Sequence, residues 1–364
     1  MNLERVLHVV TYMGRGGLET MLMNYYRHID RLKVQFDFLV HREFIADYDE
    51  EILSMGGKIY RLPYLNPFDG NYSKKLNFFF KEHPEYLIIH SHLDCMAGIP
   101  LKYAKKHGIP VRIGHAHSSN QTKDQKYFIK LLFKRNIGNY ATQLFACSKA
   151  AGEWMFNGQS FHVMNNAVET SNYAYSPQKS KEVRARLGIA VDTLVIGHVG
   201  RFAPPKNHSF LISVFNELLK EESDSKLLLV GAGDLMDTAK GQVNMLGIED
   251  KVIFTGLTKD VAELMQAMDV FVFPSIYEGL PLTIVEAQAA GLPCITSDRV
   301  PIECKITDLV YQMKLEDSIS EWVKLILQCA KEERKNTFEN ICKAGFDIEN
   351  NAEWLCNYYC KCLN

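Results

Sequence analysis

Short apolar runs rich in β-branched residues alternate with longer stretches of helical periodicity along most of the chain. The runs of the first half predict strands at Arg5–Thr11, Val34–Leu39, Lys58–Arg61, Tyr86–His90, Val111–Gly114, Gln143–Ala146 and His162–Met164. The runs of the second half predict strands at Leu194–Val199, Lys226–Val230, Val252–Thr255, Val270–Phe273 and Cys294–Ser297. Strands that alternate with helices form parallel βαβ units, so the pattern predicts an α/β protein.

A polar, irregular stretch that begins after Asn166 separates the two sets of strands. The chain has 364 residues, which is long enough for two cores of ordinary size. We therefore expect two Rossmann-like, doubly wound domains, residues 1–166 and residues 167–347, that face each other across a cleft. In such domains ligands bind at the carboxyl ends of the strands, so the loops that follow strands are examined first.

The net charge of −2 hides an asymmetry between the halves. Residues 1–166 carry a formal charge of +6, the remainder carries −8, and ten of the twelve histidines lie in the first half. This difference indicates that the halves have different tasks. The chain begins with a strand-like run, and no apolar run is long enough for a membrane span, so we expect a cytoplasmic protein with reduced cysteines.

Two loops that follow strands suit phosphate groups. Gly16 and Gly17 precede a helical run, and a helix start behind paired glycines presents N–H groups to an anion. The dinucleotide-binding fingerprint is incomplete because Glu19 stands where its last glycine would be, and a plain tight turn is an equal interpretation. In the second half, Arg201 and Lys206 lie on a proline-stiffened loop. Two cations suit a diphosphate, and a solvated basic pair is the alternative.

The segment after the strand at Val270–Phe273 is the most informative. Glu278 lies in a loop, and Glu286 lies in the helix that follows it. Leu282 and Thr283 begin this helix, and a helix N-terminus attracts anions. Carboxylates bind phosphate poorly but accept hydrogen bonds from sugar hydroxyls, so this segment predicts a site for a phosphorylated sugar.

Two His-x-His pairs lie at the ends of predicted strands, His90 with His92 and His115 with His117. We expect both pairs to point into the same cleft mouth. Metal binding is the less favoured interpretation, because such a site usually needs a carboxylate beside the histidines and the sequence supplies only Asp94 there. The Asp-x-Asp at residues 47–49 falls in an acidic helical stretch and is interpreted as a solvated face.

These loops together resemble the signature of the retaining glycosyltransferases of family 4. The specific part is Glu278-x7-Glu286 within Pro274–Ala287. The other matching segments follow the family's order: Gly16-Gly17, residues 165–168, Gly200-Arg201-Phe202 with Lys206, and residues 230–233. The resemblance spans roughly residues 5–305. It implies a GT-B fold in which the last segment, about residues 348–364 with a helix at about 348–362, returns to the first domain.

The resemblance implies a role for each matching residue. Glu286 would bind the ribose, Glu278 the donor sugar, and Arg201 and Lys206 the diphosphate. The implied donor-binding set is Gly16, Gly17, Arg201, Lys206, Thr255, Gly256, Leu257, Glu278, Gly279, Leu280, Leu282, Thr283 and Glu286. The implied catalytic set is His117, with His115 as the alternative two residues away, and Glu278, Arg201 and Lys206. Pro281 and residues 297–301 depart from the family pattern, which leaves the donor sugar open.

The resemblance further implies transfer, with retention, from a nucleotide sugar, expected to be a UDP-sugar, to a hydroxyl of a saccharide or lipid-linked saccharide in surface or capsular polysaccharide assembly. Cations and a helix dipole can stabilise the leaving diphosphate, so we expect no metal and no cofactor. No nucleic acid is expected as a partner. The alternatives are a nucleotide-sugar 2-epimerase and a catalytically silent nucleotide-sugar-binding subunit.

Residues 123–135 interleave basic with aromatic and aliphatic side chains at helical spacing in the basic half. Such a face would rest on an anionic membrane and present a lipid-linked acceptor, so we also weigh a peripheral location on the inner face of the cell membrane. A core-packed helix with a lysine-rich outer face is an equal interpretation.

Overall fold

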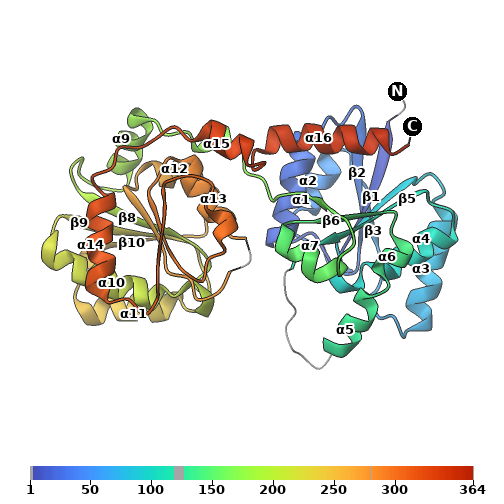
Figure 1. Ribbon diagram of the computed structural model, residues 1–364, viewed down its shortest axis with the longest axis horizontal. Helices are drawn as coiled ribbons and strands as arrows, with labels where there is room; N and C mark the ends of the chain where they lie inside the picture. The colour runs from blue at the N-terminus through green and yellow to red at the C-terminus, as the bar shows by residue number, and fades with distance from the viewer. Residues whose placement is uncertain (1–2, 119–126, 279, 364) are drawn as a thin grey trace. The chain divides into compact units, whose positions relative to one another are not determined.

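The computed structural model describes residues 3–118, 127–278 and 280–363, and the chain divides into two compact units (Figure 1). Unit 1 comprises Met1–Ala167 and Ile348–Asn364, and unit 2 comprises Val168–Asp347. This division lies one residue after the boundary expected from the polar stretch. The C-terminal segment belongs to unit 1.

Within the described residues, unit 1 is built on a parallel seven-stranded sheet with the order β3-β2-β1-β4-β5-β6-β7. The strands are β1 (Glu4–Val10), β2 (Val34–Val40), β3 (Ile59–Arg61), β4 (Ile88–Ser91), β5 (Val111–Ala116), β6 (Gln143–Ala146) and β7 (His162–Val163). All of β2 is buried, as expected for a strand covered on both faces. The strand order reverses between β1 and β4, which is where doubly wound sheets bind ligands.

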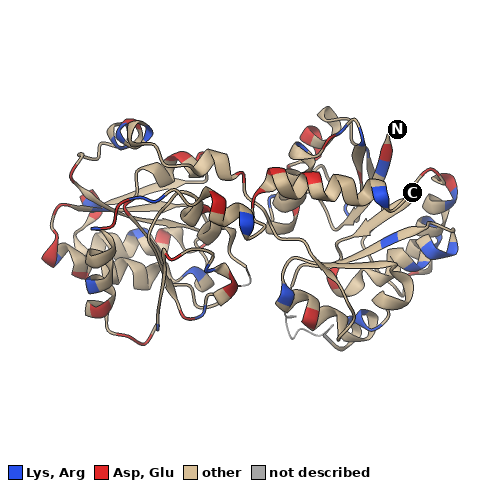
Figure 2. Ribbon diagram, turned by 45° about the horizontal axis from the view of Figure 1, so that its top comes forward, with Lys and Arg blue, Asp and Glu red and all other residues tan. Residues whose placement is uncertain are grey.

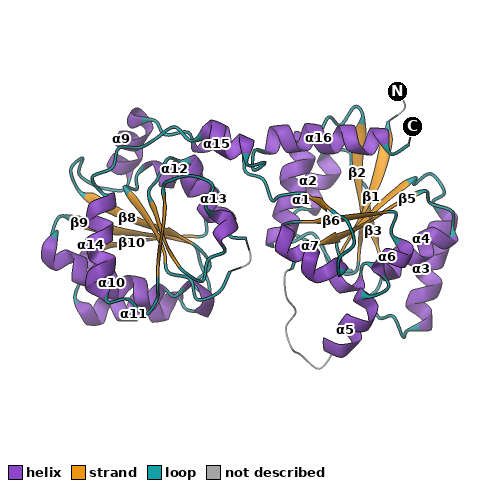
Figure 3. Cartoon of the chain, in the orientation of Figure 1, coloured by secondary structure: helices purple, strands orange, loops and turns teal. Residues whose placement is uncertain are grey.

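Helices cover both faces of this sheet (Figure 3). On one face lie α1 (Gly17–His28), α2 (Asp49–Ser54) and α16 (Ile348–Lys361), whose apolar side chains form one core with the strands. On the other face lie α3 (Gly70–Glu82), α4 (Gly98–Lys106), α6 (Ile137–Tyr140) and α7 (Lys149–Phe156). The unit also contains the 3-10 turn η1 (Asp94–Met96) and α5 (Tyr127–Lys134).

Unit 2 repeats this plan with a parallel six-stranded sheet in the described residues, ordered β10-β9-β8-β11-β12-β13. The strands are β8 (Leu194–Val199), β9 (Ser225–Val230), β10 (Val252–Gly256), β11 (Val270–Phe273), β12 (Cys294–Ser297) and β13 (Val310–Met313). The order reverses between β8 and β11, so the loops after these two strands lie together at the ligand-binding edge.

Two cores again flank the sheet of unit 2. The helices of one core are α9 (Pro177–Arg186), α12 (Val261–Gln266) and α13 (Leu282–Ala289). The helices of the other core are α10 (His208–Glu221), α11 (Met236–Leu246) and α14 (Ile319–Cys329). The shorter elements are α8 (Thr170–Tyr173), α15 (Phe338–Lys343), η2 (Pro204–Lys206), η3 (Glu249–Lys251) and η4 (Ile302–Cys304). Figure 2 shows that charged residues of both units lie mainly on helices and loops.

The interpretation of residues 47–49 as a solvated acidic face is wrong for Asp49. Its carboxylate is buried at 2% exposure, accepts a hydrogen bond from the Ala46 N–H at 2.9 Å and lies 2.5 Å from the Arg61 guanidinium. Arg61 reaches it from β3. A carboxylate can be buried when an arginine neutralises it, and this partner lies outside the local pattern that the sequence displays.

None of the helices in the described residues is long and apolar enough to cross a lipid bilayer.

Candidate functional site

Lys206 and Glu278 form an ion pair at the ligand-binding edge of unit 2. Lys206 ends η2, which follows β8, and Glu278 lies in the loop after β11. The Lys206 Nζ lies 2.6 Å from Glu278 Oε1, and the two side chains are only 20% and 11% exposed. The ammonium also lies 4.6 Å from the centre of the Phe273 ring, a cation–π contact. The structure therefore brings together a predicted phosphate ligand and a predicted sugar ligand.

Arg201, the second predicted diphosphate ligand, is exposed. Its side chain is 70% accessible, and its guanidinium lies 3.3 Å from the Asp234 carboxylate, which is 86% accessible. Water and salt weaken an ion pair at this exposure. Lys206 is thus held in place in the ligand-free protein, whereas Arg201 can exchange its surface partner for an anion at little cost.

The glycines at residues 231 and 233 are required by the packing of two loops. The Gly200 N–H donates to Val230 O at 2.9 Å, and the Phe202 N–H donates to Ala232 O at 3.0 Å. A Cβ on Gly231 would lie 2.1 Å from Gly200 O, and the φ of Gly231 is +136°. These contacts fix the loop that carries Arg201 to the loop after β9, which rigidifies the edge of the site.

The segment between the end of β11 and the first turn of α13 contains two hydroxyl groups that have no partner among the described residues. Thr283 Oγ1 and Ser275 Oγ are buried and form no hydrogen bond within the described part of the chain. Leu280 and Leu282 are half-buried, and Gly279 lies outside the described residues. Burying a hydroxyl without a partner is unfavourable, and a donor at a helix N-terminus is placed to bind an anion. Ser275 was not identified from the sequence.

Glu286 lies within α13 and is half-buried. Burial raises its pKa to about 7, and a hydrogen bond from the Tyr173 hydroxyl of α8 lowers the pKa by less than burial raises it. The same contact and burial raise the pKa of Tyr173. The sequence did not indicate Tyr173, which lies more than a hundred residues away and holds the carboxyl in place.

The stretch expected to meet the nucleobase ends β10. Gly256 has a φ of +71°, and its carbonyl accepts a hydrogen bond from the Gly231 N–H at 3.1 Å. The Thr255 hydroxyl donates to the same carbonyl at 3.1 Å. Leu257 follows with a side chain that is 73% exposed. The turn therefore places backbone groups and an apolar side chain next to the glycine loop.

Two histidines beside Lys206 were not selected from the sequence. His198 of β8 and His208 of α10 are buried, and their ring centres lie 4.7 Å apart. The pKa of His198 is lowered to about 3 and that of His208 to about 4, mainly by burial and in part by the charge of Lys206. These imidazoles are neutral, so Lys206 carries the positive charge here. The sequence offered one signal for His198, which is a polar residue within the otherwise apolar run of β8.

In unit 1, the Gly16-Gly17 loop leads into α1, with Gly16 as the residue before the helix. The Glu19 carboxylate lies against this loop, because a Cβ on Gly16 would be 2.2 Å from Glu19 Oε2. Burial raises the pKa of Glu19. An anion bound at the start of α1 would have to displace this carboxyl group or meet it protonated.

The four histidines do not all face solvent, so the expectation that both pairs point into a cleft mouth is wrong for three of them. His90, His92 and His115 are 0%, 3% and 1% exposed. They lie on the sheet face that α16 covers, a tertiary arrangement that the strand pattern does not show. His117 follows β5 and is half-buried, and its backbone N–H donates to Asp94 Oδ1 at 2.7 Å.

A cavity of about 450 Å³ opens beside this region of unit 1. Its wall is mostly apolar, and Arg42 and Lys130 are its basic residues. It is lined by Thr11, His41, Arg42, Tyr64, Leu65, Asn66, Pro67, Phe68, Leu93, Met96, Ile129 and Lys130. Thr11 and His41 directly follow β1 and β2, so the cavity lies at the carboxyl ends of these strands.

Known proteins match the chain along nearly its full length. Residues 15–172 match the family described as Glycosyltransferase Family 4, and residues 179–341 match the family described as Glycosyl transferases group 1. The glycosyltransferase EpsF of Bacillus subtilis (strain 168) is 37% identical over 98% of this chain and 96% of its own. The chain belongs to the group 1 and family 4 glycosyltransferases.

One further relative and one solved structure are also similar to the glycosyltransferase. An Escherichia coli enzyme named UDP-Gal:alpha-D-GlcNAc-diphosphoundecaprenol alpha-1,3-galactosyltransferase is 24% identical over 76% of this chain and 75% of its own. The crystal structure of Anabaena Alr3699/HepE in complex with UDP has a TM-score of 0.74 at 19% identity and covers 97% of this chain and 95% of its own. The fold of the glycosyltransferase is GT-B, as the resemblance implied.

Proposed function

We propose that the glycosyltransferase transfers a sugar from a UDP-sugar, with retention and without a metal ion, to a hydroxyl of a lipid-linked saccharide in surface polysaccharide assembly. The observation that carries this proposal is the partly buried pair of Lys206 and Glu278, 2.6 Å apart where the strand order of unit 2 reverses. The ligand-free protein thus already pairs a cation that can bind phosphate with a carboxylate that can accept hydrogen bonds from sugar hydroxyls.

The leaving group in this reaction is a nucleoside diphosphate that gains negative charge as the glycosidic bond breaks. Lys206, Arg201 and the N-terminus of α13 with the Thr283 hydroxyl are the groups that we assign to that charge. Preorganised donors of this kind stabilise a developing anion strongly because they do not have to reorient during the reaction. Glu286, with its partner Tyr173, is assigned to the ribose, and residues 255–257 to the base.

The acceptor is assigned to unit 1. The cavity of about 450 Å³ combines an apolar wall with Arg42 and Lys130, which suits a saccharide attached to a lipid through phosphate groups. His117 rather than His115 is assigned to the reacting carbon, because a group that meets substrate has to be accessible and His115 is 1% exposed. Names of relatives support the class of substrates: the Escherichia coli relative is named for a UDP-galactose donor and a diphosphoundecaprenol-linked acceptor.

Membrane contact through α5 is part of the same proposal. Phe128 and Leu132 are 81% and 60% exposed, while Phe133 packs against the core, so this helix has an apolar outer face as well as a core face. Residues 123–126 of the predicted basic stretch lie outside the described residues. Exposed apolar side chains beside lysines are typical of helices that rest on anionic lipid.

The decisive experiment incubates the purified protein with a panel of UDP-sugars and a diphosphate-linked lipid saccharide. Transfer of label from one donor to the lipid product supports the proposal, and the anomeric configuration of the product tests retention. Isomerised free donor without transfer would indicate the 2-epimerase, and binding of UDP without turnover would indicate a silent subunit. A thermal-shift screen of nucleotide sugars selects the donor beforehand, because a ligand that binds the folded state stabilises it.

A further inference from the structure

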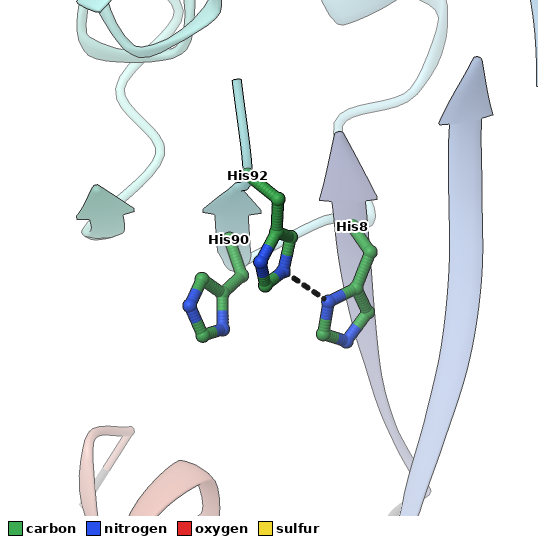
Figure 4. A group of neighbouring side chains, drawn as sticks. All are labelled: His8, His90 and His92. Carbon is green, nitrogen blue, oxygen red and sulfur yellow. Dashed lines mark hydrogen bonds between the residues drawn. The ribbon is translucent and has the colours of Figure 1, made fainter. Parts of the chain in front are cut away.

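Five histidines of unit 1 lie side by side on one face of its sheet. His8 comes from β1, His90 and His92 from the end of β4, and His115 and His117 from the end of β5, which are three adjacent strands. Residues two apart on a strand point to the same face, so the five rings share one layer. Figure 4 shows three of them, with His92 turned toward His8.

The rings form two hydrogen-bonded rows that cross the strands. In the lower row, the Tyr359 hydroxyl of α16 lies 2.6 Å from His90 Nδ1, and His90 Nε2 lies 3.0 Å from His115 Nδ1. In the upper row, His8 Nδ1 lies 3.0 Å from His92 Nε2, and His92 Nδ1 lies 2.9 Å from His117 Nε2. The upper row thus runs from a buried ring to the half-buried His117.

The ring geometry favours hydrogen bonds over a metal ion. Among the described residues, two groups of three histidines have nitrogens close enough to share an ion, and each group contains a pair of closely spaced rings with a small angle between their planes. The centres of His90 and His92 are 4.2 Å apart with planes inclined by 25°, and those of His115 and His117 are 4.1 Å apart with planes inclined by 30°. Imidazole binds a metal in the plane of its ring at about 2 Å, and planes stacked in this way do not meet within that distance.

The rings of the upper row are neutral. Burial lowers the pKa of His8 and of His117 to about 3 and keeps the pKa of His92 well below its usual range. A neutral imidazole has one N–H and one lone pair, so both bonds of the row must point in the same direction. His117 Nε2 contacts His92 in either case, which leaves Nδ1 as the nitrogen of His117 that is not part of the row.

We propose that His92, backed by His8, is a positioning residue that holds the His117 imidazole through Nε2 in one tautomer and so leaves Nδ1 for the substrate. The inference rests on the proposed function, in which His117 meets the substrate. His8 Nε2 forms no hydrogen bond within the described residues, and the His8 ring packs against Phe36 with centres 4.1 Å apart. The far end of the row is therefore fixed by packing, and the orientation of His117 depends on an unbroken row. The lower row forms no hydrogen bond to His117 and provides an internal control.

The test uses the full-length protein and three variants. His92→Phe keeps a flat ring in the stack and removes both nitrogens, His92→Asn returns an amide near the position of Nδ1, and Tyr359→Phe removes the hydroxyl of the lower row. We measure kcat and the donor KM, and the tautomer of His117 from its ring nitrogen shifts in protein with labelled histidine. A His117→Gln sample assigns the His117 signals.

We expect His92→Phe to lower kcat on the order of 10- to 100-fold, as removal of groups that orient an imidazole does elsewhere, with donor KM changed by less than about twofold. The single tautomer of His117 should be lost in this variant and recovered in His92→Asn, together with part of the turnover. Tyr359→Phe should leave both readouts as in the wild type. If His92→Phe does not fold, His8→Leu breaks the same row from its buried end, with the same expected outcomes.

An unchanged His117 tautomer in His92→Phe, or an equal fall of kcat in Tyr359→Phe, would overturn the proposal. The outcomes also separate it from the proposed function. Loss of turnover in His117→Gln with full turnover in His92→Phe refutes the positioning role alone. Full turnover in His117→Gln refutes the role of His117 in transfer, and the row would then have no effect on catalysis through His117. The nitrogen shifts decide whether His92 orients His117 even where no transfer is detected.

Discussion

The Lys206 ammonium lies 2.6 Å from the Glu278 carboxylate, although 72 residues separate the two along the chain. Each group neutralises the other in a largely buried position, where either charge alone would be unfavourable. A donor that places its diphosphate beside Lys206 and its sugar beside Glu278 would replace this contact with two new ones. The ligand-free site therefore holds both groups near the positions that the proposed reaction requires.

The first prediction concerns Lys206→Ala. Leaving-group charge grows toward the transition state, so a fixed cation interacts more strongly there than with the bound donor. Loss of one comparable electrostatic donor costs roughly 2.7–4 kcal/mol in other enzymes. We expect kcat to fall about a hundredfold or more, with a smaller change in donor affinity. A rise in KM with kcat unchanged would contradict this role.

A matched variant separates loss of the cation from loss of its partner. Glu278→Gln removes the negative charge beside Lys206 but keeps a hydrogen-bonding group of the same shape. If Lys206→Ala acts only by leaving Glu278 buried and unpaired, the double variant Lys206→Ala with Glu278→Gln should turn over as fast as the Glu278→Gln single variant. If Lys206 stabilises the leaving group, the double variant should turn over about a hundredfold more slowly than Glu278→Gln, while its stability recovers relative to Lys206→Ala.

The second prediction concerns Glu286→Ala. Loss of a charge-assisted hydrogen bond to the ribose should weaken UDP binding on the order of 1.5–3 kcal/mol, with the fold intact. Titration calorimetry with UDP measures this directly. Glu221→Ala, which removes an exposed carboxylate of α10, serves as the control and should bind like the wild type. Unchanged affinity in a folded Glu286→Ala protein would refute the assignment.

The sheet core was predicted well because buried parallel strands are continuous apolar runs. The expected bounds of the strands at Gln143–Ala146, Leu194–Val199, Val270–Phe273 and Cys294–Ser297 agree with β6, β8, β11 and β12 to the residue. β13 was missed. It lies at the edge of its sheet, with one buried residue followed by exposed and half-buried ones, so its sequence lacks the apolar run.

The sequence identified candidate site residues but not the contacts between them. Glu278 and Lys206 follow strands that sequence could identify, but the order of those strands in the sheet brings them together. Tyr173 could not be predicted as the partner of Glu286, because a hydrogen bond between distant segments leaves no periodic signal. The burial of His92 likewise depends on the tertiary packing of its sheet face.

The third prediction tests metal independence. If Lys206, Arg201 and the start of α13 neutralise the diphosphate, transfer should persist in excess chelator at the rate measured without it. The comparison uses protein that was dialysed against chelator and then assayed with and without added magnesium. Activity that disappears with chelator and returns with magnesium would show that a divalent ion supplies the charge instead.

The fourth prediction concerns α5. Phe128→Ser and Leu132→Ser together should reduce co-sedimentation with vesicles that contain anionic lipid. The reason is that burying a serine side chain in lipid is much less favourable than burying a phenylalanine or a leucine. Leu246→Ser, a partly exposed leucine at the end of α11 in unit 2, is the matched control. Binding by the wild type should weaken as salt is raised. Absence of vesicle binding, or binding that salt leaves unchanged, argues against membrane contact.

The last prediction follows from the raised pKa of Glu286. The pKa of Glu286 is about 7 in the folded protein, and its ordinary value of 4.5 applies to the unfolded chain. Between pH 4.5 and pH 7 the folded state therefore binds more protons than the unfolded state. Stability of the ligand-free protein should therefore fall as pH rises from about 4.5 through about 7, by on the order of 2–3 kcal/mol from this group. Glu286→Gln does not titrate and should lack that loss.

Thermal unfolding at pH 5 and at pH 8 distinguishes the two proteins. At pH 5 the wild-type carboxyl is largely protonated, and the two should unfold at similar temperatures. At pH 8 the variant should unfold several degrees higher, because about 1 kcal/mol corresponds to roughly 2–4 °C in a unit of this size. Glu221→Gln, an exposed carboxylate, should show no such difference. An equal difference between Glu286→Gln and the wild type at both pH values would mean that the carboxyl does not change its protonation between pH 5 and pH 8, which contradicts a pKa of about 7.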